Sequence, residues 1–312
     1  MSVSILHSFR KPGSIIMNKK FLDYSVAMVT PFTIDGDFDA NAVPALTKYY
    51  IEGANVPGLL ISGSTGEQHC LTISERKELY ALVAKSSPRN YPLYAGIATF
   101  KTKDAVELAQ AAEMSGYSGI MLGVPPYRLP TQRELFSYVE DVANATKLPI
   151  FLYNNPRRNT VQVEPRTYAK LVKTVKNSNL YGIKETGNVA NVKKIKELLG
   201  DEATEKQSFF TGNDEMYVDL YTNHGFTGIT SIAGVLFPGD MTRTNTYLQN
   251  GEVDKAEEIM KTLLPKIQIM QKAGFLQSLK YILRKRGAPA GYCPAPLLDP
   301  TDEDKKLLDA LI

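Results

Sequence analysis

The 312-residue chain has two cysteines, three histidines and no tryptophan. Cys70 and Cys293 form neither a disulfide framework nor a zinc-binding spacing, which is typical of a reducing compartment, so we expect a cytoplasmic protein. The sequence contains no His-x-x-x-His pair, no Cys-x-x-Cys pair and no acidic calcium loop. We therefore expect no metal site and no cofactor.

The chain also lacks a strong charge imbalance and a long apolar run. Its 36 basic and 33 acidic residues give a formal charge of +3 and are interspersed, so we expect neither a nucleic-acid nor a membrane partner. No apolar stretch approaches the roughly 20 residues of a membrane-spanning helix. Polar residues interrupt the apolar side chains of residues 1–17, so we expect no signal peptide there. We interpret residues 1–20 as a disordered N-terminal extension.

Short apolar runs alternate with longer amphipathic runs along most of the chain. The apolar runs are rich in Val, Ile, Leu and Tyr, and they predict strands at residues 25–30, 58–62, 93–97, 119–123, 150–153, 180–184, 208–211 and 228–232. Their continuous apolar character is typical of a parallel sheet that is buried on both faces. Helical patterns lie between them at residues 40–52, 75–85, 103–115, 132–146, 164–175, 189–199, 214–223 and 238–249.

This alternation predicts an α/β fold, a (β/α)8 TIM barrel at residues 21–250. A doubly wound open sheet is the alternative, but it usually carries a glycine-rich turn after its first strand, where this chain has Thr30-Pro31-Phe32. Residues 251–312 contain only helical patterns, at 252–272, 274–286 and 301–311. This C-terminal helical extension is too short for a core of its own, so we expect it to pack on the side of the barrel.

Polar residues at the carboxyl ends of barrel strands face one shared site. Those ends carry Thr30, the run from Ser62 to Glu67, Tyr127, Tyr153, Lys184, Gly212 and Ser231. Lys184 ends an apolar strand, so it is either a lysine that extends to solvent or an amine that attacks a carbonyl group. A nucleophilic Lys184 must be neutral. Its pKa must then fall from about 10.4 toward about 7–8, which asks for roughly 4 kcal/mol from desolvation and cationic neighbours.

Other residues near these strand ends could bind substrate or move protons. The run Gly63-Ser64-Thr65-Gly66-Glu67 favours a tight loop that holds a carboxylate, although an ordinary serine-rich turn has the same composition. Tyr153 could relay protons through its phenol or simply pack at its strand end. Arg158 could form a bidentate pair with a second substrate carboxylate or lie in solvent. His69 and Cys70 are adjacent, but no Asp or Asn is spaced to orient them as a nucleophile pair.

Three blocks resemble the signature blocks of the dihydrodipicolinate synthase/N-acetylneuraminate lyase family of pyruvate-dependent class I aldolases. The blocks are Gly63 to Glu67, Tyr153-Asn154-Asn155-Pro156 and Gly182-Ile183-Lys184-Glu185. The resemblance implies a barrel with a C-terminal helical extension, assembled as a homo-oligomer, either a dimer or a tetramer. It also implies that Lys184 forms a Schiff base with pyruvate, that Tyr153 shuttles protons, and that Ser64 acts with them. Ser64 and Thr65 would bind the pyruvate carboxylate.

The sequence leaves the aldehyde partner of pyruvate open. Arg158 matches the arginine that dihydrodipicolinate synthases use for the carboxylate of the aldehyde. Those enzymes usually have a second tyrosine where Arg128 follows Tyr127 here, and they usually continue as Arg-Thr-Gly where this chain has Arg158-Asn159-Thr160. A sugar-acid or sialic-acid aldolase is therefore an alternative, as is a catalytically silent barrel that binds 2-oxo acids. The remaining residues expected to contact substrate are Tyr127, Arg128, Gly212 and Thr230.

Overall fold

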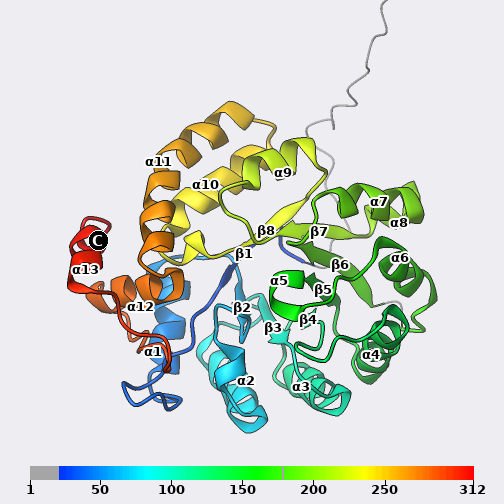
Figure 1. The fold of residues 1–312 in the computed structure, drawn as a ribbon, viewed down its shortest axis with the longest axis horizontal. Coiled ribbons are helices and arrows are strands. Elements are labelled where there is room, and N and C mark those ends of the chain that lie inside the picture. Colours follow the sequence, from blue (N-terminus) through cyan, green and yellow to red (C-terminus); the bar gives the residue numbers. More distant parts are fainter. Residues whose placement is uncertain (1–20, 178) are drawn as a thin grey trace, which may run out of the picture.

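The structure is a computed structural model that describes residues 21–177 and 179–312, and eight parallel strands close into a barrel in chain order (Figure 1). The strands are β1 (Tyr24–Ala27), β2 (Leu59–Ile61), β3 (Leu93–Ile97), β4 (Gly119–Gly123), β5 (Ile150–Asn154), β6 (Leu180–Glu185), β7 (Ser208–Thr211) and β8 (Gly228–Ser231). β1 pairs with β8, which confirms the predicted barrel and excludes the open sheet. The extension expected at residues 1–20 lies outside the described residues.

Helices surround the barrel and connect its strands (Figure 1). They are α1 (Val43–Lys48), α2 (Ile73–Ser86), α3 (Thr102–Met114), α4 (Gln132–Ala145), α5 (Pro156–Asn159), α6 (Pro165–Thr174), α7 (Ala190–Leu199), α8 (Asp201–Glu205), α9 (Tyr217–Asn223) and α10 (Pro238–Gln249). Each of the eight predicted helical segments overlaps one of these helices, with α2 beginning two residues earlier and α3 one residue earlier than predicted. The sequence pattern misses α5 and α8, because helices of four and five residues are too short to show an amphipathic period.

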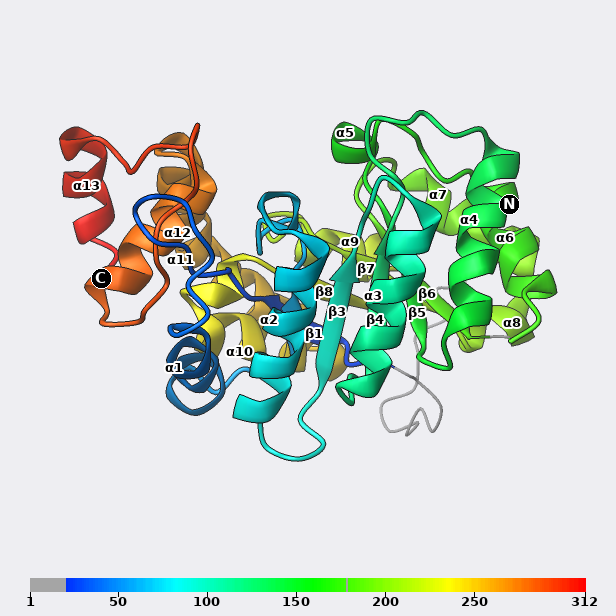
Figure 2. The same cartoon turned by 90° about the horizontal axis from the view of Figure 1, so that it is seen from below.

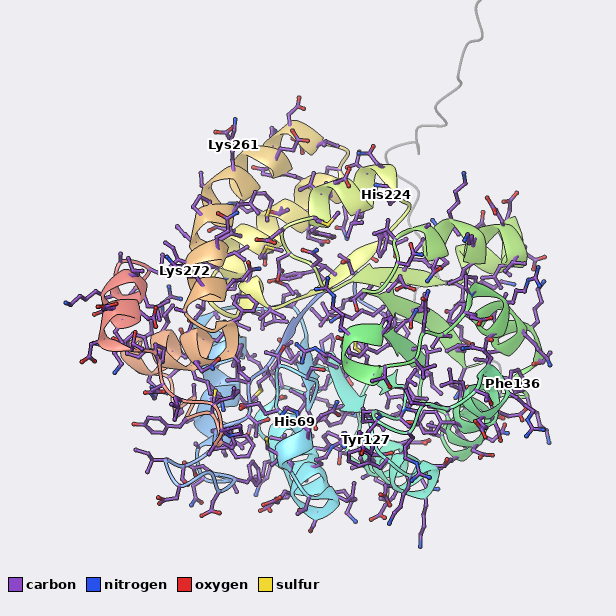
Figure 3. The ribbon with its side chains drawn as sticks, viewed as in Figure 1. His69, Tyr127, Phe136, His224, Lys261 and Lys272 are labelled. Carbon is purple, nitrogen blue, oxygen red and sulfur yellow. The ribbon has the colours of Figure 1, made fainter. Side chains whose placement is uncertain are left out.

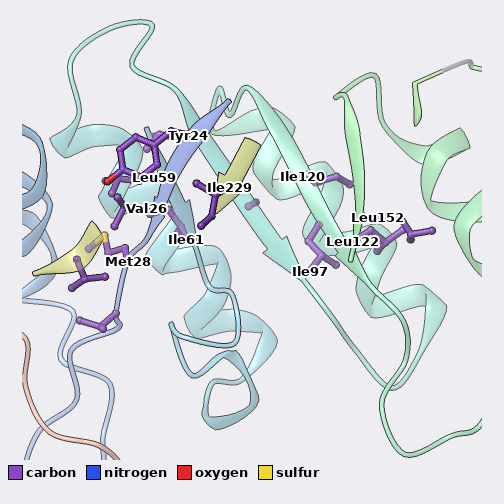
Figure 4. Packing of buried hydrophobic residues seen from close by; sticks show 14 of the residues in the cluster. Tyr24, Val26, Met28, Leu59, Ile61, Ile97, Ile120, Leu122, Leu152 and Ile229 are labelled. Carbon is purple, nitrogen blue, oxygen red and sulfur yellow. The ribbon is translucent and has the colours of Figure 1, made fainter. Parts of the chain in front are cut away.

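Side chains that point outward from the strands form the main core between the barrel and its helices. Successive side chains of a strand point to opposite faces, and Val26, Leu59 and Ile120 belong to the outward, fully buried set (Figure 4). Leu79 of α2 and Leu108 of α3 lie in the same cluster. This continuous packing holds the strands, and therefore their carboxyl ends, in fixed relative positions.

Side chains that point inward fill the lower part of the barrel with a second, smaller cluster. We call it the barrel floor, and it consists of Phe21, Leu60, Tyr94, Met121, Phe151 and Phe210. The Phe151 ring meets Phe21 edge to face, with centroids 4.8 Å apart, and lies 4.5 Å from Phe210. Gly182 of β6 leaves room for this ring, because a Cβ at position 182 would lie 2.4 Å from it.

The C-terminal extension consists of α11 (Val253–Lys272), α12 (Phe275–Lys285) and α13 (Asp302–Asp309). It lies along one side of the barrel, and α11 contacts α9 and α10 (Figure 2). In the same view, the extension rises to the level of α5 and of the loops that follow the strands. None of the helices in the described part of the chain is long and apolar enough to cross a membrane.

Candidate active site

A cavity of about 670 Å³ opens above the barrel floor, at the carboxyl ends of the strands. Four residues that line it lie two positions after floor residues, so they face the same interior side of the barrel. Gly96 follows Tyr94, Gly123 follows Met121, Tyr153 follows Phe151, and Gly212 follows Phe210. Because three of these four residues are glycines above large side chains, the interior is filled at the floor and open at the mouth.

Gly212, which follows β7, makes room for the side chain of Lys184. A Cβ at position 212 would lie 2.5 Å from Cε and 2.8 Å from Nζ of Lys184. Gly212 also lines the cavity, as expected of a residue near the substrate. Any larger residue here would displace the amine.

Lys184 lies near the end of β6 and is only 7% exposed, so it does not extend to solvent. Its Nζ lies 3.5 Å from the carbonyl oxygen of Thr230 and 5.1 Å from the centroid of the Tyr153 ring. Burial lowers the pKa of Lys184 to about 8; Asp214 opposes this shift and Arg158 adds to it. With this pKa, roughly a tenth of the molecules carry the neutral, nucleophilic amine at pH 7 and about half at pH 8.

Asp214, which the sequence pattern did not single out, joins the loop after β7 to the end of β8. One carboxylate oxygen accepts a hydrogen bond from the Ser231 hydroxyl at 2.5 Å, and the other accepts from the N–H groups of Ile232 and Ala233 at 3.1 and 3.0 Å. Burial raises the pKa of Asp214, and these hydrogen bonds oppose that rise. The helix predicted from residue 214 begins only at Tyr217, because the segment before it carries this contact.

Hydrogen bonds join the ends of β5 and β6 at the residues that directly follow Tyr153 and Lys184. Tyr153 pairs with Lys184 in the strand register, and Asn154 pairs with Glu185. The Asn154 side chain donates to the Glu185 carboxylate at 2.7 Å, and that buried carboxylate also accepts from Asn191 and from two backbone N–H groups. This network holds the phenol and the amine at a constant separation.

Tyr153, Ser64 and Thr65 line the cavity together with Lys184, as the sequence predicted. The Tyr153 hydroxyl accepts a hydrogen bond from the Asn155 side chain at 2.6 Å, which orients the phenol. All three side chains are half-buried, so a bound substrate can reach their hydroxyl groups. Two hydroxyls on a loop that begins and ends with glycine suit a carboxylate group.

Charged and polar side chains line the rim of the cavity, and the sequence analysis had identified only some of them. Arg158 lines the cavity from α5, as expected, and the adjacent Arg157 lines it too. Glu215, from the loop after β7, adds a carboxylate. Gln271 and Phe275 reach the same cavity from the C-terminal extension, far along the chain from the barrel strands. No local signal could have indicated these last two residues.

Three residues expected to contact substrate lie outside the cavity lining. Thr230 is buried; its carbonyl oxygen faces Lys184, and its hydroxyl accepts a hydrogen bond from Ser25 at 3.3 Å. Tyr127 is 84% exposed on the segment between β4 and α4, and the neighbouring Arg128 is also exposed (Figure 3). A role for these two side chains at the substrate therefore stays a prediction.

Comparison with known proteins places this site in a family. The chain matches the model of the dihydrodipicolinate synthetase family over residues 20–312. It is 31% identical over 283 residues to a 4-hydroxy-tetrahydrodipicolinate synthase of Streptococcus pneumoniae (strain Hungary19A-6), covering 90% of this chain and 88% of that protein. A dihydrodipicolinate synthase structure from Aquifex aeolicus is similar with a TM-score of 0.85 and 26% identity, covering 93% of this chain and 97% of that one.

A further solved structure was determined with a ligand. It is YagE from E. coli K12, a prophage protein of the dihydrodipicolinic acid synthase family, in complex with pyruvate. It has a TM-score of 0.83 and 26% identity, with 93% of this chain and 97% of that chain covered.

A closed parallel barrel with a buried lysine at its mouth has the architecture of a class I aldolase. The chain belongs to the dihydrodipicolinate synthetase family. This membership confirms the family predicted from the three sequence blocks, and with it the class of pyruvate-dependent Schiff-base lyases and synthases.

Proposed function

We propose that Lys184 forms a Schiff base with pyruvate and that the resulting enamine adds to an aldehyde that carries a carboxylate. The activity would be that of a 4-hydroxy-tetrahydrodipicolinate synthase, with aspartate semialdehyde as the aldehyde. The observation that carries this proposal is the buried Lys184 amine, whose pKa is about 8, in one cavity with Ser64, Thr65 and Arg158.

The proposed reaction begins with attack of the neutral Lys184 amine on the keto carbon of pyruvate. Tyr153 then donates its proton to the departing hydroxyl, so that water leaves, an iminium forms and the phenolate of Tyr153 is free to accept a proton. The iminium withdraws electrons, so a C3 proton leaves through Tyr153 and an enamine results. The enamine carbon attacks the aldehyde carbon, and Tyr153 returns the proton to the aldehyde oxygen. The amino group of the added aspartate semialdehyde unit then attacks the iminium carbon, which closes the ring and releases Lys184; with an aldehyde that lacks an amine, water would hydrolyse the iminium instead. Proton transfer by a positioned phenol contributes typically about 10²–10⁴-fold to such a rate.

Arginine and hydroxyl groups in the cavity support two substrates that each carry a carboxylate. The hydroxyls of Ser64 and Thr65 suit the pyruvate carboxylate, and the Arg158 guanidinium suits a second carboxylate through a bidentate pair. Arg157 adds a second positive charge beside it. The cavity, at about 670 Å³, leaves room for both substrates at once.

A sugar-acid or sialic-acid aldolase is the second candidate, and a different part of the rim favours it. Asn213 and Glu215 line the cavity with an amide and a carboxylate. Both groups can hydrogen-bond the hydroxyls of a polyhydroxylated substrate, whereas the Glu215 carboxylate would repel an anionic aldehyde.

We also propose a homo-oligomer in which Tyr127 and Arg128 act on the cavity of a second copy. Both side chains are exposed and lie outside the cavity of their own chain. Phe100 and Leu129, on neighbouring loops, are 60% and 63% exposed and add apolar surface that association would bury. Sedimentation velocity of the wild type would show a dimer or tetramer, and a monomer at micromolar concentration would contradict the proposal.

The experiment that tests the reaction is borohydride reduction in the presence of pyruvate, followed by peptide mass mapping. One reduced pyruvyl group on Lys184 is expected, and unmodified protein or a label on another lysine would refute the mechanism. Condensation and cleavage assays with aspartate semialdehyde, sialic acid and 2-keto-3-deoxy sugar acids then identify the partner. Trapping at Lys184 without turnover of any of these compounds would favour a silent barrel that binds 2-oxo acids.

A further inference from the structure

A buried ion pair outside the cavity has no part in the proposed reaction. It joins the carboxylate of Glu67, at the end of the loop that carries Ser64 and Thr65, to the ammonium group of Lys280 on α12. The two side chains are 1% and 0% exposed. Removing two charges from water is costly, and an apolar pair of similar volume is often as stable or more so. Stability alone is therefore a weak explanation for this pair.

The loop that carries Ser64 and Thr65 turns at Glu67. Glu67 has a φ of +51°, in the left-handed region that a residue with a side chain rarely adopts. Its N–H donates to the Ser64 carbonyl at 3.1 Å, and the Thr30 hydroxyl donates to the Gly66 carbonyl at 2.6 Å. The carboxylate of Glu67 does not line the cavity, whereas Ser64 and Thr65 do. The turn at Glu67 thus directs the Glu67 carboxylate away from the cavity that Ser64 and Thr65 line.

The Lys280 end of the pair is held rigidly by other parts of the chain. Its ammonium group donates to the carbonyl of Tyr292 at 2.6 Å and lies 4.8 Å from the centroid of the Phe32 ring. Phe32 follows β1, and Tyr292 belongs to the segment between α12 and α13. Contacts from the extension and from the segment after β1 therefore hold the Lys280 ammonium group in place, and this group binds the Glu67 carboxylate.

We infer that the Glu67–Lys280 pair positions Ser64 and Thr65 for the pyruvate carboxylate, so that the C-terminal extension sets the affinity of the barrel for the 2-oxo acid. The inference rests on the carboxylate-binding role proposed above for Ser64 and Thr65. Glu67 and Lys280 are positioning residues, because neither touches the reacting atoms. An ion pair suits this purpose better than apolar packing, because it specifies one direction for the Glu67 side chain.

The test measures pyruvate affinity and stability separately in four variants. Borohydride trapping at increasing pyruvate concentration gives a half-saturating concentration and a limiting rate, and urea unfolding gives stability. The variants are Glu67→Gln, Lys280→Met, the double variant Glu67→Gln/Lys280→Met, and Asp299→Asn as a control. Asp299 pairs with Arg284 of α12 at 2.5 Å, so its substitution also removes an ion pair of the extension, but one that does not involve Glu67 or Lys280.

Glu67→Gln should raise the half-saturating pyruvate concentration at least about tenfold, the smallest loss expected when a hydrogen bond to a charged group is misplaced. Its limiting rate should stay within about threefold of the wild type, because Lys184 and Tyr153 are untouched. The double variant should recover stability relative to Lys280→Met, since no unpaired charge remains, yet keep the weak pyruvate binding. Asp299→Asn should bind pyruvate as the wild type does.

Two results would overturn the inference while leaving the proposed function intact. The first is unchanged pyruvate affinity in a folded Glu67→Gln protein, while the wild type is trapped at Lys184. If Glu67→Gln fails to fold, the double variant takes its place in this comparison. The second is a double variant in which stability and pyruvate affinity recover together, since the pair would then act only through stability. A wild type that is not trapped at all would overturn the proposed function and, with it, this inference.

Discussion

The barrel floor and the mouth of the cavity are built from the same strands, yet they differ completely in chemistry. The floor consists of large apolar and aromatic side chains, whereas the mouth, two residues further along the strands, carries glycines, Tyr153 and Lys184. Alternation of side chains makes both layers face inward. The difference shows that the same strands supply both a rigid support and a reactive site. The two layers differ only in the residue types at successive inward-facing positions.

The two layers should therefore respond differently to substitution. Changes in the mouth should abolish or shift the chemistry with little loss of stability, because its side chains border open space. Changes in the floor should lower stability with little effect on the chemistry, because its side chains contact one another. Four experiments test this division.

Replacing the amine should have the largest effect. Lys184→Met should show no borohydride trapping of pyruvate and should lose activity by on the order of 10⁴-fold or more, because no other lysine of residues 21–177 and 179–312 lines the cavity. Intact-mass analysis and turnover assays check this. Its free energy of unfolding should not fall, because a buried cation is replaced by an apolar side chain of similar length. Residual trapping at another lysine would contradict the assignment.

Gly182 of β6 and Gly212, directly after the neighbouring strand β7, offer a direct contrast between the layers. Gly212→Ala places a methyl group against Lys184, so the trapping rate should fall by about 10²-fold while stability is largely kept. Gly182→Ala places a methyl group 2.4 Å from the Phe151 ring and should lower the free energy of unfolding by about 1–3 kcal/mol. Trapping kinetics and urea titration distinguish them. Identical behaviour of the two variants would break the comparison.

The pH dependence of trapping should report the pKa of Lys184, which is about 8. The neutral amine is the nucleophile, so the trapping rate should rise with pH and level off above about 8, falling about tenfold per unit below it. Arg158→Ala removes a positive charge that lowers this pKa, so the profile should move to higher pH. Arg157→Ala is the matched control and should leave the midpoint in place. Equal shifts in both variants would contradict the specific role of Arg158.

The smallest effect is expected at the one polar group of the floor. The Tyr94 hydroxyl accepts a hydrogen bond from the Leu22 N–H at 3.0 Å. Tyr94→Phe should lower the free energy of unfolding by about 1 kcal/mol, because that N–H loses its partner. Pyruvate trapping should be the same as in the wild type. A marked loss of trapping in a stable Tyr94→Phe protein would show that floor and mouth are coupled.

The sequence by itself determined the barrel and part of the site. Continuous apolar runs separated by amphipathic ones report whether a segment is buried on two faces or on one, and that pattern is local. It placed all eight strands, and it placed Lys184 and Tyr153 at strand ends, where a barrel brings such residues together. The block from Gly63 to Glu67 was likewise visible in the sequence.

Only the tertiary structure decided which distant groups complete the site. Asp214 is tied to Ser231, Gln271 and Phe275 reach the cavity from the extension, and Glu67 meets Lys280 on α12. Each of these contacts depends on how the barrel closes and how the extension packs on it, and a periodic pattern carries no information about such pairs. The depressed pKa of Lys184 is of the same kind, because it depends on burial of the amine in the closed barrel and on the positions of Asp214 and Arg158.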